Sequence, residues 1–390
     1  MKLHRMLERL IIALFVLVLA VPFVATVVGI DTSGTAEENR EPAPFPTLEF
    51  IRYSVARWPA EFSRYFSDHF AFRSHLVRWQ ARFRLRVLRT SPSPDVILGH
   101  DDWLFYGTSV AMDDYSVSSP VSEEDLDAWR DALQHTQDWL EAQGVTYLFV
   151  IAPDKHVIYP ELMPNSIRRI GAVSHADQLV RHLRDHSSVS VLDLHDPLEA
   201  AKAFDRLYHR TDTHWNDRGA LVAYQEIVER LGSPGGMRPL LRSDFEPRQI
   251  TVPGMDLAAM LGLQRILRED DLRLVPRAPR EARVVEPAVP DPWWTGARIV
   301  TERPGVLPRA VVFRDSFGSA LIPFLSEHFS RAVYLWQNDI DTEVISAERP
   351  NVVIQEWVGR RIGLTTPYDA VAAAPGSRQF QGTLAPSTGP

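Results

Sequence analysis

Short apolar runs rich in β-branched and aromatic residues recur along most of the chain, and they constrain its fold more than any other feature. The run at 145–152 (VTYLFVIA) is continuously apolar, as expected of a central strand that is covered on both faces. Helical stretches lie before or between the runs, which occupy residues 145–152, 189–194, 310–313, 332–336 and 351–354. This alternation predicts an α/β fold, a three-layer α/β/α sandwich around a mostly parallel sheet.

The predicted domain covers residues 48–362 and carries one long interruption. Residues 234–308 hold eleven prolines and a single clear helical segment at 256–263, which predicts an insertion over one edge of the sheet. The stretch 48–88 is rich in aromatics and arginine, and we expect it to form helices that pack back on the body as core. Beyond residue 362 the composition turns to Ala, Pro, Gly, Ser and Thr, which predicts a disordered tail at 363–390.

The N-terminal part of the chain predicts a membrane anchor. Residues 10–30 carry no charge over 21 positions, and a hydrocarbon core needs about 20 helical residues. The cations at Lys2, Arg5 and Arg9 favour a cytoplasmic location for residues 1–9 and export of everything after the span. The polar, proline-bearing residues 31–47 are then an extended linker. A cleaved signal peptide is the alternative, although its apolar region is usually about 7 to 15 residues long.

Composition excludes several classes of protein. The chain holds 42 Lys plus Arg against 50 Asp plus Glu, a net charge of −8, which argues against a nucleic-acid partner because binding to phosphates depends on clustered cations. The absence of cysteine removes disulfides, thiolate metal sites and cysteine nucleophiles together.

A candidate nucleophile follows the apolar run at 310–313. This run leads into Arg314-Asp315-Ser316-Phe317-Gly318, and a helical stretch comes next. A serine at a tight turn between strand and helix is exposed at the carboxyl edge of a sheet, where main-chain N–H groups can bind an oxyanion. The sequence therefore predicts Ser316 as a nucleophile. The alternative is an ordinary N-cap serine.

A candidate base and its orienting carboxylate lie in the approach to another helix. Asp212 and His214 stand two residues apart, so in extended backbone both side chains project to one side, and the carboxylate can orient the imidazole. Serine needs such a base to become a nucleophile, which joins the pair to Ser316. A metal site built from His209, Asp212 and His214 matches no zinc spacing, so we predict no metal. Ordinary capping residues remain the other alternative.

Four ordered blocks resemble those of one family. They are DDWLFYG at 101–107, PDKHVIYPE at 153–161, TDTHWN at 211–216 and DSF at 315–317. On these blocks the chain resembles the AlgX/AlgJ-like family of SGNH-hydrolase-related polysaccharide O-acetyltransferases, and the resemblance covers roughly residues 48–361, nearly all of the exported part. The resemblance implies an SGNH-like sandwich and places the family's catalytic residues on Asp212, His214 and Ser316. Arg314 and Gly359 depart from the expected pattern. The predicted anchor is similar to that of the AlgJ branch.

The resemblance also implies a reaction and its partners. We expect O-acetylation of a secreted or cell-surface polysaccharide through an acetyl-serine intermediate, without a cofactor. The expected location is the periplasm, on the inner membrane, with a membrane-bound O-acyltransferase supplying the acetyl donor. A carbohydrate esterase with the same three residues and a non-catalytic polysaccharide-binding component of an export complex are the alternative functions.

Four further residues are candidates for substrate binding. Lys155 and Tyr159 follow a strand end and either line an acceptor groove or form a structural turn. Arg314 either binds an anionic sugar or holds Glu356 in an ion pair, the role we favour. Trp215 suits sugar stacking, although core packing explains most tryptophans equally well.

Overall fold

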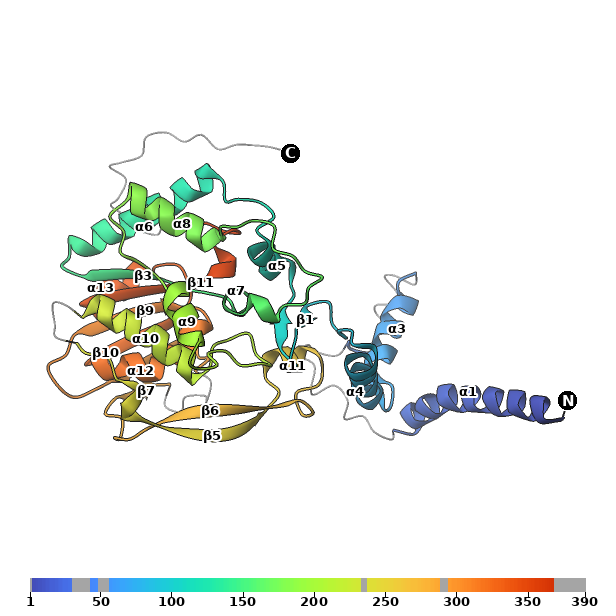
Figure 1. Ribbon diagram of the computed structural model, residues 1–390. Coiled ribbons are helices and arrows are strands. Elements are labelled where there is room, and N and C mark those ends of the chain that lie inside the picture. The colour runs from blue at the N-terminus through green and yellow to red at the C-terminus, as the bar shows by residue number, and fades with distance from the viewer. Residues whose placement is uncertain (1, 30–42, 48–55, 233–236, 288–293, 368–390) are drawn as a thin grey trace. The chain divides into compact units, whose positions relative to one another are not determined.

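The computed structural model describes residues 2–29, 43–47, 56–232, 237–287 and 294–367 (Figure 1). The chain divides into two compact units, Met1–Val96 with Gly254–Leu267, and Ile97–Pro253 with Arg268–Pro390. Most of the predicted linker and the last 23 residues of the predicted tail, 368–390, lie outside the described residues. Each unit is described by itself below.

The larger unit is built on a seven-stranded mixed sheet in the order β4-β3-β11-β9-β10-β8-β7. The five strands from β4 to β10 are parallel to one another. At the β10 edge, β8 pairs antiparallel with β10, and β7 pairs antiparallel with β8. All five apolar runs form strands, as the sequence predicts. The strands are β3 (Thr146–Ala152), β4 (Val191–Asp193), β7 (Arg283–Glu286), β8 (Arg298–Glu302), β9 (Arg309–Arg314), β10 (Arg331–Trp336) and β11 (Val352–Val358).

Helices cover both faces of this sheet, so the predicted three-layer α/β sandwich is confirmed (Figure 1). Alternate residues of β3 show the two layers, because Leu148 and Val150 belong to one buried core and Phe149 and Ile151 to the other. The first core includes α7 (Lys155–Ile158), α9 (His195–Lys202), α10 (Asp217–Leu231) and α12 (Ile322–Leu325). The second includes α6 (Glu123–Glu141), α8 (His175–His186) and α13 (Thr342–Glu348).

The insertion predicted at 234–308 is only partly separate from the sheet. Strands β5 (Phe245–Pro253) and β6 (Arg268–Pro276) form their own antiparallel pair, but β7 and β8 extend the main sheet. The prediction differs from the structure here because β8 pairs with β10, whose main-chain N–H and C=O groups would otherwise be unpaired at the edge of the sheet. Helix α11 (Asp256–Met260) is shorter than the segment predicted at 256–263. Two short strands, β1 (Val96–Leu98) and β2 (Leu104–Tyr106), also pair, and α5 (Ser109–Ser116) follows them.

Among the described residues of the smaller unit, one helix is long and apolar enough to cross a membrane. This helix, α1 (Lys2–Val28), has its candidate span at Arg5–Thr26. The described part of this unit also contains the helices α3 (Trp58–His69) and α4 (Arg73–Phe83). Helix α4 continues directly into a π-helical turn, η2 (Arg84–Leu88). Among residues 56–88, Asp68, Ala71 and Ala81 alone are buried, so within this unit the expected aromatic core does not form.

Candidate active site

Ser316 lies in the turn that leaves β9. The turn is held by Asp315, whose carboxylate accepts hydrogen bonds from the main-chain N–H groups of Phe317 (2.9 Å) and Val358 (2.9 Å). A short 3₁₀ helix, Phe317–Leu321, follows the turn. Since the second bond ties the turn to the end of β11, Ser316 is fixed at the carboxyl edge of the sheet, where its side chain is partly exposed.

Asp212 and His214 lie in the loop before α10. Asn216 ends this loop by capping the helix, accepting from the main-chain N–H groups of Arg218 (3.0 Å) and Gly219 (3.2 Å). The Asp212 carboxylate accepts from the main-chain N–H of His214 (3.0 Å), which folds the loop tightly around the pair.

The structure brings the three predicted catalytic side chains together. His214 Nδ1 lies 2.6 Å from Asp212 Oδ1, and His214 Nε2 lies 2.7 Å from Ser316 Oγ. Asp212 is buried, whereas 27% of the His214 side chain is exposed, so a substrate can reach the imidazole. Burial alone would raise the pKa of Asp212, but the charge of His214 and its hydrogen bond lower the pKa overall and keep the carboxylate ionised. The arrangement can deprotonate a serine hydroxyl and stabilise the resulting imidazolium.

Lys155 lies beneath the loop that carries this pair. It is buried at the start of α7, and its ammonium group donates to the carbonyl oxygens of His209 (2.9 Å), Arg210 (3.2 Å) and Asp212 (2.5 Å). The side chain is therefore committed to the loop backbone and does not line an open groove. This geometry corresponds to the structural alternative that the sequence left open for Lys155.

A carboxylate from β6 holds the same loop from another side. Glu269 accepts from the main-chain N–H (2.7 Å) and hydroxyl (2.8 Å) of Thr211 and from the Arg210 N–H (3.2 Å). His209 Nδ1 lies 3.3 Å from Glu269 and 3.2 Å from Asp271. Burial would lower the pKa of His209, but the hydrogen bonds and charges of Asp271 and Glu269 raise it to about 9. His209 is therefore a largely buried cation at neutral pH.

The sequence analysis missed Glu269 and Asp271. Their spacing of two places both on the same face of β6, where both are buried. That pattern, two acids on the inward face of a strand, is a local signal, but the cation that faces them comes from 60 residues away in sequence.

The other three substrate-binding candidates are also buried and contact other residues of the protein. The Tyr159 hydroxyl accepts from the main-chain N–H of Leu207 (2.9 Å), and Trp215 packs edge-on against Phe317 at 5.1 Å between ring centroids. The Arg314 guanidinium donates to the Trp294 (2.8 Å) and Gly296 (3.1 Å) carbonyls and to Ser319 Oγ (2.8 Å). Glu356, its favoured partner in the sequence analysis, accepts from the Asp315 N–H (3.0 Å), and the charge of Arg314 acts on the Glu356 carboxyl group.

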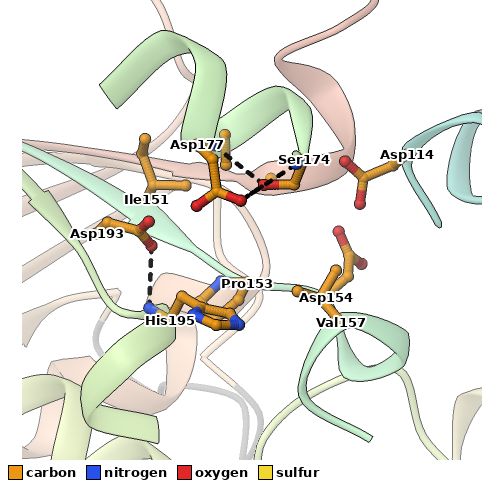
Figure 2. A pocket seen from close by; sticks show the side chains of 11 residues that line it. Asp114, Ile151, Pro153, Asp154, Val157, Ser174, Asp177, Asp193 and His195 are labelled. Carbon is orange, nitrogen blue, oxygen red and sulfur yellow. Dashed lines mark hydrogen bonds between the residues drawn. The ribbon is translucent and has the colours of Figure 1, made fainter. Parts of the chain in front are cut away.

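A pocket beyond the ends of β3 and β4 carries further carboxylates, and Figure 2 shows its lining. The hydrogen bonds among its lining residues cap the N-termini of two helices. Ser174 and Asp177 form the capping box of α8, and Asp193 accepts from the N–H of His195 (2.9 Å), the first residue of α9. Burial raises the pKa of Asp193, partly offset by that bond. Neither the catalytic pair nor Ser316 lines the pocket.

Two buried clusters in the larger unit have metal-ligating atoms close together. They are Asp114, Asp154 and His156, and His209, Glu269 and Asp271. In each, protein cations supply the opposing charge, since Arg360 pairs with Asp154, and Arg218 with Asp271 (2.7 Å). These ion pairs account for the carboxylates, and we assign no metal to either cluster.

Comparison with known proteins shows which sequences and folds the chain is similar to. Residues 96–286 match the family model described as "SGNH hydrolase-like domain, acetyltransferase AlgX". A "Probable alginate O-acetylase AlgJ" of Pseudomonas syringae pv. tomato is 27% identical over 247 residues, which cover 63% of this chain and 59% of that protein. The protein of the same name from Pseudomonas putida is 30% identical over 139 residues, covering 35% and 34%. The chain thus spans less than two thirds of either relative.

Among solved structures, PatB1 of Bacillus cereus superposes with a TM-score of 0.51 at 17% identity, covering 69% of this chain and 97% of PatB1. This likeness shows a shared fold. The family model, which covers just under half of the chain, and the AlgJ relatives support an AlgX/AlgJ-like, SGNH-hydrolase-like family for this chain.

Proposed function

We propose that this protein is an O-acetyltransferase that acetylates an exported polysaccharide through an acetyl-serine intermediate. The observation that carries the proposal is the position of His214, which lies within hydrogen-bond distance of both Asp212 and Ser316. The names of its relatives, alginate O-acetylases, and the acetyltransferase family of residues 96–286 supply the reaction class.

In the first half-reaction Ser316 takes the acetyl group. His214 Nε2 accepts the hydroxyl proton while Ser316 Oγ attacks the acetyl carbonyl carbon, and Asp212 stabilises the imidazolium. The bond between the carbonyl carbon and the donor oxygen breaks, and His214 returns the proton to that leaving oxygen. We assign the main-chain N–H of Ser316 as one donor to the oxyanion.

In the second half-reaction a sugar hydroxyl replaces the donor. His214 accepts the proton of that hydroxyl, whose oxygen attacks the acetyl carbonyl carbon. The ester bond to Ser316 Oγ breaks, and the proton passes from His214 to the serine oxygen. Each cycle therefore moves one acetyl group and restores all three side chains, so the chemistry needs no cofactor.

The buried groups under the loop are assigned a positioning role. Lys155 and Glu269 together fix residues 209–212 through six hydrogen bonds, five to or from the backbone and one from the Thr211 hydroxyl. Because an error of about 1 Å in a catalytic group costs about a hundredfold in rate, this rigidity contributes to catalysis without contact with the substrate.

The location that fits this function is the periplasm, with α1 held in the inner membrane. Acetyl-CoA is cytoplasmic, so an enzyme on the outer side of that membrane needs another donor. We propose that a membrane-bound O-acyltransferase passes acetyl groups across the membrane to this chain. If the N-terminal segment is cleaved as a signal, the same catalytic unit is released into the periplasm.

The full-length chain in detergent, incubated with an acetyl ester and an alginate oligosaccharide, tests the proposal. We expect acetylated oligosaccharide from the wild type and none from Ser316→Ala, with an acetyl group trapped on the Ser316 peptide by rapid acid quenching and mass spectrometry. Ser346→Ala is the matched control, because its hydroxyl only bonds the Thr342 carbonyl within α13. Transfer that persists in Ser316→Ala would refute the acetyl-serine route.

The same experiment separates the alternatives. Free acetate released at one rate, with or without the oligosaccharide, identifies an esterase, because water has then replaced the sugar as acceptor. A non-catalytic component predicts that cells carrying Ser316→Ala still make fully acetylated polymer.

A further inference from the structure

The smaller unit carries a basic amphipathic helix beside the end of α1. We propose that α4 and η2, residues 73–88, lie on the surface of the bilayer that α1 crosses, at the end where α1 terminates, and bind anionic phospholipid there. We call residues 73–88 the interfacial helix. This inference does not depend on the acetyl-transfer chemistry, but it rests on α1 spanning a membrane.

The charge of this region is one-sided. Between Asp68 and Asp95 the sequence contains no acidic residue, although the chain as a whole has a net charge of −8. The same stretch holds six arginines, namely Arg73, Arg78, Arg82, Arg84, Arg86 and Arg89. A local excess of guanidinium groups on an acidic protein points to a negatively charged partner.

The interfacial helix also exposes large apolar side chains. The exposed fractions are 46% for Leu76, 66% for Trp79, 41% for Phe83 and 63% for Val87. Trp79 and Phe83 stack on each other with 5.7 Å between ring centroids. On the opposite side of the helix Ala81 is buried, so the apolar stripe faces away from the packed side of its own unit.

The arginines lie along the edges of this apolar stripe, as they do in amphipathic helices that lie in a membrane interface. At 3.6 residues per turn, Arg82 falls along one edge of the stripe and Arg73 along the other. Long cationic side chains at such edges reach the headgroups while the apolar residues between them enter the acyl boundary.

Contacts with α1 place this surface at the level of the membrane. The main-chain N–H of Ala71, just before α4, donates to Thr26 Oγ1 (2.7 Å), and Phe66 packs against Phe23 at 6.4 Å between ring centroids. Thr26 is the last residue of the candidate span, so α4 begins where the hydrocarbon core ends. Aromatic side chains gather at the same place, as they do at membrane interfaces, with Trp58 stacked on Phe62.

A bilayer fits these features better than a protein partner does. The same membrane is present wherever α1 is inserted, and its headgroups supply anionic charge that matches the arginines. A protein partner would have to provide an acidic, apolar surface at this one height. We therefore commit to anionic phospholipid and treat protein capture as an outcome that would refute the proposal.

Site-directed labelling of the full-length chain tests the proposal cleanly, because the natural sequence contains no cysteine. Single cysteines at Trp79, Phe83 and Val87 carry an environment-sensitive fluorophore, and Arg82 on the edge of the same helix is the matched control. Exposed Ile170 in the larger unit is the aqueous control. The protein is reconstituted in phosphatidylcholine vesicles with or without phosphatidylglycerol, and alkaline extraction verifies that α1 is inserted.

We expect labels at 79, 83 and 87 to be blue-shifted and quenched by spin-labelled lipid, with much weaker quenching at 82 and none at 170. Removing phosphatidylglycerol, or introducing Arg82→Gln, Arg86→Gln and Arg89→Gln together, should reduce this quenching. Because all these positions are exposed, the substitutions remove no buried contact. Labels at 79, 83 and 87 that are quenched from water as strongly as the label at 170 would overturn the proposal. Lipid quenching seen only after another membrane protein is added would also overturn it.

Discussion

The largely buried imidazolium of His209 makes the stability of the larger unit depend on pH in a defined direction. Its pKa lies at about 9 in the folded protein, against an ordinary value of 6.5. At about 1.4 kcal/mol for each pH unit, this difference corresponds to about 3 kcal/mol of stability. Only 14% of the His209 side chain is exposed, so solvent screening removes little of that value.

The sign follows from the raised pKa. Below pH 6.5 His209 is protonated in both the folded and the unfolded chain, and its interactions with Glu269 and Asp271 contribute in full. Between 6.5 and about 9 the unfolded chain loses its proton first, so the contribution falls as pH rises. Burial would raise the pKa of Glu269 and of Asp271, but His209 lowers both overall, that of Asp271 to about 2. Both acids therefore stay ionised between pH 6.5 and about 9. The pH dependence in this range comes from the proton of His209 alone, so its interaction with the two acids is counted once.

Urea unfolding of the full-length chain in mild detergent measures this term. His209→Gln keeps a hydrogen-bond donor beside Glu269 but carries no charge at any pH. The free energy of unfolding of the wild type, minus that of His209→Gln, should be about 3 kcal/mol larger near pH 6 than near pH 10. His135→Gln, at an exposed position on α6, controls for general effects of histidine removal.

A difference between wild type and His209→Gln that stays constant from about pH 6 to about pH 10 would refute the reasoning. It would mean that His209 is neutral in the folded protein and that Glu269 and Asp271 are balanced by other groups. A parallel loss of transfer rate above about pH 9 is expected, because the loop that carries Asp212 loses one of its anchors.

Three further substitutions test the site. Asp212→Asn should lower the transfer rate by about a thousandfold to ten-thousandfold with little change in the urea midpoint, because it removes the charge that orients the imidazole; an unchanged rate would contradict the triad. Lys155→Met removes the ammonium donor from three loop carbonyls, of which that of Arg210 keeps a donor, the Leu104 N–H (2.9 Å), and should destabilise the unit by about 2 to 4 kcal/mol, measured by urea unfolding, whereas a neutral result would show that the loop holds itself. In Gly318→Ala the new Cβ would lie 2.6 Å from Arg314 Cβ, so we expect a loss of about 1 to 3 kcal/mol and slower transfer. Gly359→Ala, whose Cβ meets nothing nearer than 3.6 Å, should be tolerated, and equal effects of the two glycine substitutions would exclude the steric explanation.

Much of the fold was predictable because it depends on local sequence patterns, such as apolar runs and helical spacing. A strand that is buried on both faces is continuously apolar, and so is the run at 145–152. Its place inside a covered sheet could therefore be inferred without knowing which strands lie beside it. The spacing of Asp212 and His214 likewise predicted that the two side chains share one side of the loop. The edge strands β7 and β8 were missed because they are short, and part of the adjacent chain is rich in proline.

The roles of the polar residues around the site were less predictable. Lys155 and Tyr159 look the same in sequence whether they face a sugar or the interior, and the structure turns both inward against residues 207–212. Glu269 and Asp271 gave a local sign of burial, but nothing near them identified His209 as the cation they face.

The sequence by itself determined which segments form the parallel strands, which helix is apolar enough to span a bilayer, and which residue types could carry acyl chemistry. Those properties depend on neighbours within a few positions, through side-chain alternation, helical period and turn chemistry. Only the tertiary structure decided that Ser316 meets His214 from 102 residues away and that buried charges hold their loop. Such contacts depend on how the strands are ordered in the sheet, which brings distant chain segments to one edge and leaves no trace in the local sequence.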